Sequence, residues 1–187
     1  MKRVEIVACV FILISLVAES HATVTQITER EKCPESYAGC YKISGVITQK
    51  DSKEIGQIAD RIVASRNRNS IFQLDSAGGD VEAAIKIGRE LRRLGAMAAV
   101  LEDATCASSC VFVLAGATTR VAAGQIGIHR PYSLRTDLRD YNSIQAEQRK
   151  LSRMAKEYLE EMNVTPQLYD AMMRVNSEKS EFFLLGN

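Results

Sequence analysis

The stretch Ile-Phe-Gln-Leu-Asp-Ser-Ala-Gly-Gly-Asp-Val, residues 71–81, decides how this chain is expected to fold. Ile71–Leu74 is short and apolar, as in a buried strand. Gly78 and Gly79 interrupt the pattern, and Asp80 is a favoured N-cap for the helix that the next residues predict. Two glycines after a buried strand let the backbone approach a ligand closely and direct its amides outward. Taken alone, a Gly-Gly pair is more often an ordinary strand-to-helix turn.

Strands and helices alternate on both sides of this stretch. The helix that follows Asp80 has apolar residues at helical spacing and ends near Gly95. The order β-α-β-α-β-α-β is typical of an α/β protein with mainly parallel strands, whose sites lie beyond the carboxyl ends of the strands. The other expected strands are Tyr41–Thr48, Ala96–Leu101, Arg120–Ala122 and Ile126–Ile128, and the other expected helices are Asp51–Ser65 and Ser108–Gly116.

The C-terminal part of the chain has a different pattern. Asp137–Met162 is long, charged and amphipathic, with apolar residues every three or four positions. It is expected either to pack on its own domain or to extend toward another subunit, and the pattern leaves both open. Thr165-Pro166 starts one further helix, because proline suits its first turn. Phe182–Leu185 is expected to be a short final strand.

The composition indicates a single globular domain after a leader. The chain has 187 residues, 46% of them hydrophobic and 25% charged, with a net charge of +1, so nothing indicates nucleic-acid binding. Residues 1–22 are typical of a signal peptide, with a basic start, the apolar run Ile6–Val17, and Ser20-His21-Ala22 as a cleavage site. An uncleaved membrane anchor is the alternative. Thr23–Ser36 is polar and expected to be loosely ordered, within an N-terminal segment at 23–40, and the folded domain covers 41–187.

Four cysteines remain after removal of the leader, which contains Cys9. An even number in an exported chain indicates disulfides, and three pairings are possible. The local pairing, Cys33–Cys40 and Cys106–Cys110, is the simplest. A zinc site is less favoured, because neither pair has C-x-x-C spacing.

The segment around Ser108 and the residue His129 contribute the chemistry. Ser108 is expected in the first turn of an apolar helix, where free amides favour an oxyanion. His129 is the only histidine of the mature chain, and Pro131 restricts the residue that follows it. A serine, a histidine and a glycine turn are the parts needed for acyl transfer. The structural alternatives are a helix-capping serine, Ser108 or Ser109, and a hydrogen-bonded histidine at a strand end.

Together these motifs resemble the Clp protease proteolytic subunit and the wider ClpP/crotonase-like superfamily. Asp75-Ser-Ala-Gly-Gly-Asp-Val81 is similar to the Asn-Ser-Pro-Gly-Gly-type turn of that family. Ala107-Ser-Ser-Cys-Val-Phe112 is similar to its nucleophile segment, and Ile128-His-Arg-Pro131 to its base segment. The resemblance runs from about Val46 to Leu185. It implies a repeated β-β-α spiral with a mainly parallel sheet and a long handle helix at about 137–162.

The resemblance also implies a role for each matched residue. Ser108 would be the nucleophile, His129 the general base, and the amides of Gly78 and Ser109 the oxyanion hole. The family's acidic third residue corresponds by position to Asn176 or its neighbour Ser177, neither of which is acidic; Asp170 and Glu178 are the other candidates. The handle helix would make subunit contacts in a homo-oligomer.

These implications predict an exported serine hydrolase. It would be an endopeptidase that acts on peptides or unfolded chains without a cofactor or metal. It would also act without ATP, because export separates it from the cytoplasmic ATPase of the family. The alternative is a catalytically inactive binding or assembly protein of the same fold. An acyl-CoA site, as in the crotonase branch, is disfavoured by the retained Ser108 and His129 and by export.

Overall fold

The computed structural model describes residues 23–29, 33–133, 140–177 and 180–184. The expected leader lies outside the described residues, and with it the cleavage site and the alternative of an anchor. Within the described ranges, none of the helices combines the length and the apolar character that a membrane span requires.

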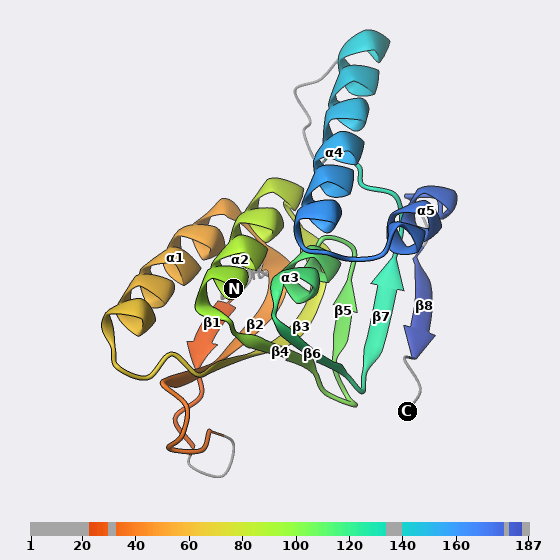
Figure 1. Ribbon diagram of the computed structural model, residues 1–187. Coiled ribbons are helices and arrows are strands. Elements are labelled where there is room, and N and C mark those ends of the chain that lie inside the picture. The colour runs from red at the N-terminus through yellow and green to blue at the C-terminus, as the bar shows by residue number, and fades with distance from the viewer. Residues whose placement is uncertain (1–22, 30–32, 134–139, 178–179, 185–187) are drawn as a thin grey trace, which may run out of the picture.

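The strands form one branched, mainly parallel sheet (Figure 1). The branch point is β3 (Ser70–Gly79). The first half of β3 pairs with β4, and β4 pairs with β6. Near the end of β3, Ser76 pairs with β5, and β5 pairs with β7. The first and last strands, β1 and β8, pair antiparallel with β2 and β7. The other strands are β1 (Thr23–Gln26), β2 (Gly39–Ile47), β4 (Met97–Val100), β5 (Thr105–Ala107), β6 (Thr119–Ala122), β7 (Gln125–Ile128) and β8 (Glu181–Leu184).

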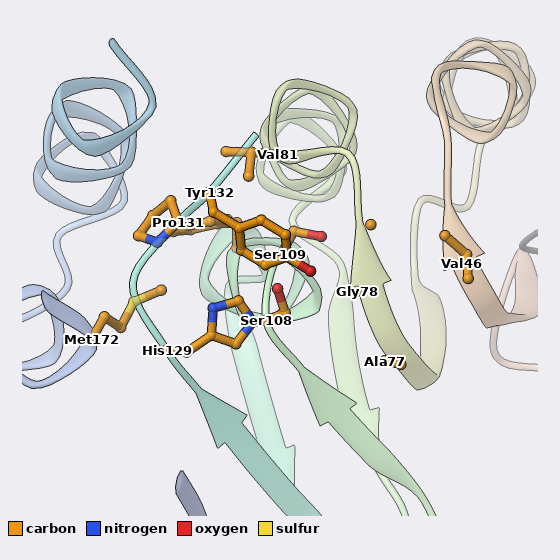
Figure 2. A pocket seen from close by; sticks show the side chains of 12 residues that line it. Val46, Ala77, Gly78, Val81, Ser108, Ser109, His129, Pro131, Tyr132 and Met172 are labelled. Atoms are coloured by element: carbon orange, nitrogen blue, oxygen red, sulfur yellow. The ribbon is translucent and has the colours of Figure 1, made fainter. Parts of the chain in front are cut away.

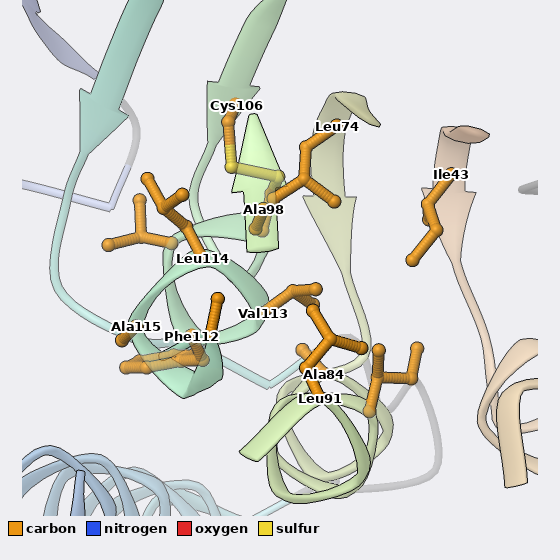
Figure 3. Packing of buried hydrophobic residues seen from close by; sticks show 14 of the residues in the cluster. Ile43, Leu74, Ala84, Leu91, Ala98, Cys106, Phe112, Val113, Leu114 and Ala115 are labelled. Atoms are coloured by element: carbon orange, nitrogen blue, oxygen red, sulfur yellow. A yellow bond between two sulfur atoms is a disulfide. The ribbon is translucent and has the colours of Figure 1, made fainter. Parts of the chain in front are cut away.

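Three helices pack against the sheet and one another. These are α1 (Gln49–Ala64), α2 (Val81–Leu94) and α3 (Cys110–Gly116). Helix α2 lies between the other two, and α3 contacts β3, β5 and β7. Figure 3 shows the buried side chains of α2, α3 and the strands interleaved, with the disulfide of Cys106 among them. Because α3 is completely buried, its apolar sequence is explained by its position in the core.

Local capping explains where the helices begin and end. Asp80 caps α2 as predicted, since its side chain accepts from the amide of Ala83 at 2.8 Å. Gly95 ends that helix in the left-handed conformation, with φ of 66°. Helix α1 begins at Gln49, earlier than the predicted Asp51. The reason is a capping box, in which the Asp51 carboxylate accepts from the amide of Thr48 at 2.7 Å.

Several sequence-based expectations differ from the structure. Strand β3 continues to Gly79, so the turn expected after Leu74 is part of a strand that pairs with β2. The segment 23–36 is not loosely ordered throughout, because Thr23–Gln26 pairs with β2 along the edge of the sheet. The short strand β5 lies within the cysteine segment, where no strand was expected. Helix α3 begins at Cys110 and not at Ser108, which lies in the preceding turn. These differences depend on partners distant in the sequence, which local patterns do not reveal.

The long amphipathic segment forms α4 (Tyr141–Glu161), which projects from the body of the protein (Figure 1). One face of its C-terminal half is buried, at Leu151, Ala155, Tyr158 and Leu159, and the hydroxyl of Tyr158 donates to the carbonyl of Phe112 in α3 at 2.8 Å. Its outer half exposes Tyr141 and Ile144. The helix therefore packs on its own domain at one end and presents apolar side chains to solvent at the other. The following helix, α5 (Pro166–Arg174), has proline at its start as predicted.

Candidate active site

The order of the strands brings the three predicted segments together. Strands β3, β5 and β7 are parallel neighbours, with Ser76 opposite Cys106 and Ala107 opposite Gly127. Gly78, Ser108 and His129 each lie one or two residues beyond these pairs, at the same edge of the sheet. All three line one cavity of about 250 Å³ (Figure 2). The structure therefore places Ser108, His129, Gly78 and Ser109 in a common site.

Ser108 occupies a tight turn between β5 and α3. Its φ is 56°, an uncommon conformation for a residue with a side chain. The turn is held by a hydrogen bond from the amide of Ser108 to the carbonyl of Gly127, at 2.8 Å. A disulfide between Cys106 and Cys110, whose Cα atoms are 5.3 Å apart, spans it covalently. Left-handed backbone at a non-glycine residue is often found at functional sites, because the surrounding structure has to enforce it.

Both predicted disulfide pairs are present. The second, between Cys33 and Cys40, joins the N-terminal segment to the start of β2, with the Cα atoms 5.6 Å apart. The cysteines are therefore used as local bridges, and neither pair is available for a zinc site. Among the described residues, no group of three histidine, cysteine, aspartate or glutamate side chains could hold a metal ion.

Gly78 is in very close contact with the serine turn. A Cβ atom at this position would lie 2.6 Å from the Cβ of Ser108 and 2.9 Å from the amide nitrogen of Ser109. Its φ of 98° also disfavours any residue with a side chain. Glycine is therefore required here both by its conformation and by the close approach of β3 to the turn at Ser108 and Ser109.

His129 follows β7 and is buried. Its Nδ1 lies 2.8 Å from the carbonyl oxygen of Arg130. Because a carbonyl can only accept, Nδ1 carries the proton of this hydrogen bond, and Nε2 of the neutral ring has a free lone pair. Figure 2 shows the imidazole beside the hydroxyl of Ser108. No hydrogen bond joins these two described side chains, which is common when such a site is empty.

Asn176 lies close in the chain to residues that contact the histidine segment. The carbonyl of Val175 accepts from the amide of Arg130 at 3.1 Å. The side chain of Asn176 is exposed, and its oxygen accepts from the hydroxyl of Ser177 at 3.4 Å. Nδ1 of His129 thus donates to the Arg130 carbonyl, and Asn176 as the third member stays a prediction. Of the other candidates, Asp170 is exposed and Glu178 lies outside the described residues.

The two predicted oxyanion-hole amides differ in their hydrogen bonding. Within the described ranges, the amide of Ser109 has no acceptor. The amide of Gly78 donates to the hydroxyl oxygen of Ser76 at 3.0 Å. That hydroxyl in turn donates to the carbonyl of Gly45 at 2.5 Å. One of the two amides is therefore free for a ligand in this conformation, and the other is already bonded.

The walls of the cavity are mostly apolar and come from five separate segments. They were not identified from the sequence, since no local pattern connects residues so far apart. Tyr132 lies at the rim, 41% exposed, with its ring centroid 5.5 Å from that of His129. The apolar wall residues are Val46, Ala77, Val81, Phe112, Pro131 and Met172.

Asp75 supports the site from outside the cavity. Its carboxylate contacts the ammonium of Lys42 at 2.9 Å and accepts from the amide of Thr105 at 3.4 Å. The hydrogen bond from Lys42 is the main reason that the pKa of Asp75 is lowered from its ordinary value. Asp75 therefore ties β3 to β2 and to the start of β5, which leads to the turn at Ser108.

Comparisons with known proteins agree on the fold. The sequence matches no protein-family model and no curated protein. The structure is similar to a mutant of ClpP1 from Listeria monocytogenes, with a TM-score of 0.60 and 14% identity over 78% of this chain and 82% of that one. It is also similar to a mutant of the membrane-bound stomatin-specific protease 1510-N, with a TM-score of 0.54 and 18% identity over 75% of this chain and 70% of that one. The chain thus has a ClpP-like fold, as the sequence motifs predicted.

Proposed function

We propose that this protein is a serine hydrolase, and more specifically an endopeptidase that works through an acyl-enzyme. The observation that carries the proposal is the convergence of Ser108, on a left-handed turn, with a histidine whose Nε2 is free to accept a proton. One of the two similar structures, 1510-N, is a protease by name, which supports the same class of reaction.

The proposed reaction uses atoms whose positions follow from the site. The Ser108 oxygen attacks the carbonyl carbon of a peptide bond while its proton passes to Nε2 of His129. The amide of Ser109 donates to the oxyanion that forms. The C–N bond then breaks, and the leaving amine takes the proton from Nε2. Water hydrolyses the resulting ester in the same manner, which regenerates the serine.

The Arg130 carbonyl takes the role of the third residue in this scheme. Its hydrogen bond fixes the ring and the tautomer of His129, as a triad carboxylate does. A carbonyl dipole stabilises the imidazolium less than a full negative charge, so a slower reaction is expected than in an enzyme with a complete triad. Asn176 would add a second orienting contact if its side chain turned toward the ring.

The cavity indicates the class of substrate. Its apolar walls favour an apolar side chain beside the bond that is cut, as found in peptides and unfolded proteins.

We further propose that the protein is exported and works without an ATPase. The two disulfides are compatible with an oxidising compartment. The exposed Tyr141 and Ile144 of α4 provide an apolar surface for homo-oligomer contacts.

Labelling with a fluorophosphonate probe tests this function. We expect the purified protein to be labelled at Ser108, and Ser108→Ala and His129→Ala to abolish labelling without changing the melting temperature greatly. Asn176→Ala, compared with Gln167→Ala as an exposed control on α5, tests the third position: a selective loss of rate in Asn176→Ala would support its role. Absence of labelling in folded wild-type protein, both oxidised and reduced, would refute the proposed chemistry.

The second candidate is a catalytically inactive binding or assembly protein. Two observations favour it: Ser108 and His129 are not hydrogen-bonded to each other, and the Gly78 amide is already occupied. In that case the wild type would remain unlabelled, while Ile144→Asp would still reduce the molecular mass measured by light scattering if α4 mediates assembly.

A further inference from the structure

Ser76 fills an irregularity in the pairing of β2 and β3. Ser44 pairs with Asp75 and Val46 pairs with Gly78, so that two residues of β3 lie opposite Gly45 alone. The side chain of Ser76 is 3% exposed. Its hydroxyl lies between the two strands, where it donates to the Gly45 carbonyl and accepts from the Gly78 amide.

This arrangement affects the oxyanion hole directly. The Gly78 amide is one of its two expected donors, yet its hydrogen is directed at the Ser76 oxygen, 3.0 Å away. Gly78 approaches the nucleophile turn instead through its Cα, where an added Cβ would meet Ser108 and Ser109. In the resting protein the hole thus has one ready donor, the amide of Ser109.

We propose that Ser76 is a positioning residue whose hydroxyl retains the Gly78 amide in the resting protein and yields it to the oxyanion during reaction. This inference rests on the proposed function. The exchange is favourable because a hydrogen bond to a charged acceptor is roughly twice as strong as one to a neutral acceptor. Ser76 keeps its bond to the Gly45 carbonyl throughout, so its own proton is not left unpaired. The Gly78 amide would thereby contribute to the transition state more than to the bound substrate, the condition for faster chemistry.

The rate of fluorophosphonate labelling tests the inference. In this reaction the Ser108 oxygen bonds to phosphorus, the P–F bond breaks, fluoride leaves, and the proton passes to Nε2 of His129. Ser76→Ala removes the competing acceptor, and one neutral hydrogen bond predicts a second-order rate higher by about 2- to 10-fold. A merely structural role for Ser76 would instead lower the rate.

Two variants serve as controls. Ser70→Ala removes another buried hydroxyl of β3, one without a hydrogen-bond partner among the described residues, and should label at the wild-type rate. Ser76→Thr retains the hydroxyl and should also match the wild type. If its extra methyl group prevents folding, the comparison of Ser76→Ala with Ser70→Ala still decides. Hydrogen exchange of the Gly78 amide should accelerate in Ser76→Ala only.

The outcomes separate this inference from the function on which it rests. Faster labelling of Ser76→Ala at Ser108, with Ser70→Ala unchanged, supports the inference. Wild-type labelling at Ser108 combined with an equal or slower rate in Ser76→Ala overturns the inference alone. Wild-type protein that is folded but unlabelled, or labelled independently of Ser108, overturns the proposed function and the inference together.

Discussion

Removing the disulfide that spans the nucleophile turn should affect both stability and reactivity. Cys106 and Cys110 are four residues apart, and the Cys33–Cys40 bridge closes a loop of similar size, with a separation of seven. For loops this short, chain entropy predicts that each bridge contributes about 2 kcal/mol to the free energy of unfolding. The double variants Cys106→Ala/Cys110→Ala and Cys33→Ala/Cys40→Ala should therefore lose similar stability in urea or thermal unfolding.

Reactivity should distinguish the two variants. Ser108 has a φ of 56°, and backbone strain of this kind costs about 1–3 kcal/mol. Without the covalent bridge the turn can relax, and that energy corresponds to a labelling rate lower by about 5- to 150-fold. The remaining hydrogen bond from Ser108 to the Gly127 carbonyl limits the loss, so a value near the lower end is expected.

The assay is the second-order rate of fluorophosphonate labelling at a temperature where both variants are folded. The variant without Cys33–Cys40 should react at the wild-type rate, because that bridge lies in the N-terminal segment, outside the residues that line the cavity. Equal rates in both double variants would show that the bridge beside Ser108 does not maintain the conformation of the turn.

Three further changes have expected outcomes. Gly78→Ala adds a methyl group in contact with the turn at Ser108, at an unfavourable φ, and should lower the free energy of unfolding by roughly 2–6 kcal/mol. The control is Gly56→Ala, where no described atom lies within 4 Å, and it should be neutral or stabilising. Equal effects of the two variants in a denaturant titration would contradict the contact. Tyr158→Phe removes the buried hydrogen bond to the Phe112 carbonyl and should lower the unfolding free energy by about 1 kcal/mol, measured thermally; no change would argue against that bond. The pKa of Asp75 is lowered in the folded state, so its ionised carboxylate stabilises the fold above its ordinary pKa, and this stabilisation is lost as the pH falls through the folded pKa. Asp75→Asn should therefore make the free energy of unfolding depend less on pH in the acid range. An unchanged slope in pH-dependent unfolding would refute the assignment.

Much of the fold could be predicted because its signals are local. Asp80 and Gly95 mark the ends of α2 through contacts within the helix and its caps. The two disulfides join cysteines only a few residues apart. The motifs that contain Gly78 and His129 adjoin strands that the sequence predicted, whereas the strand before Ser108 was not expected, so the expectation that all three motifs meet came from the resemblance to the ClpP family.

What remained hidden depended on residues that are distant in the sequence. The pairing of β1 with β2 and the insertion of β5 required partners that local periodicity does not identify. The cavity walls also come together only through the packing of separate elements. The conformation of Ser108 is another case, because its turn is held from the neighbouring strand by the Gly127 carbonyl.

The sequence by itself determined where most helices and strands lie and which residues are candidates for the chemistry, because caps, apolar periodicity and short loops act over a few residues. Only the tertiary structure decided how those residues are hydrogen-bonded. It places the Arg130 carbonyl where it accepts from Nδ1 of His129, and the Ser76 hydroxyl where it accepts from the Gly78 amide. The second of these depends on the register of two strands, which places Gly45 beside a serine 31 residues later. Such pairings follow from the packing of the whole sheet, and they determine which backbone amides of the candidate site are free to donate to a ligand.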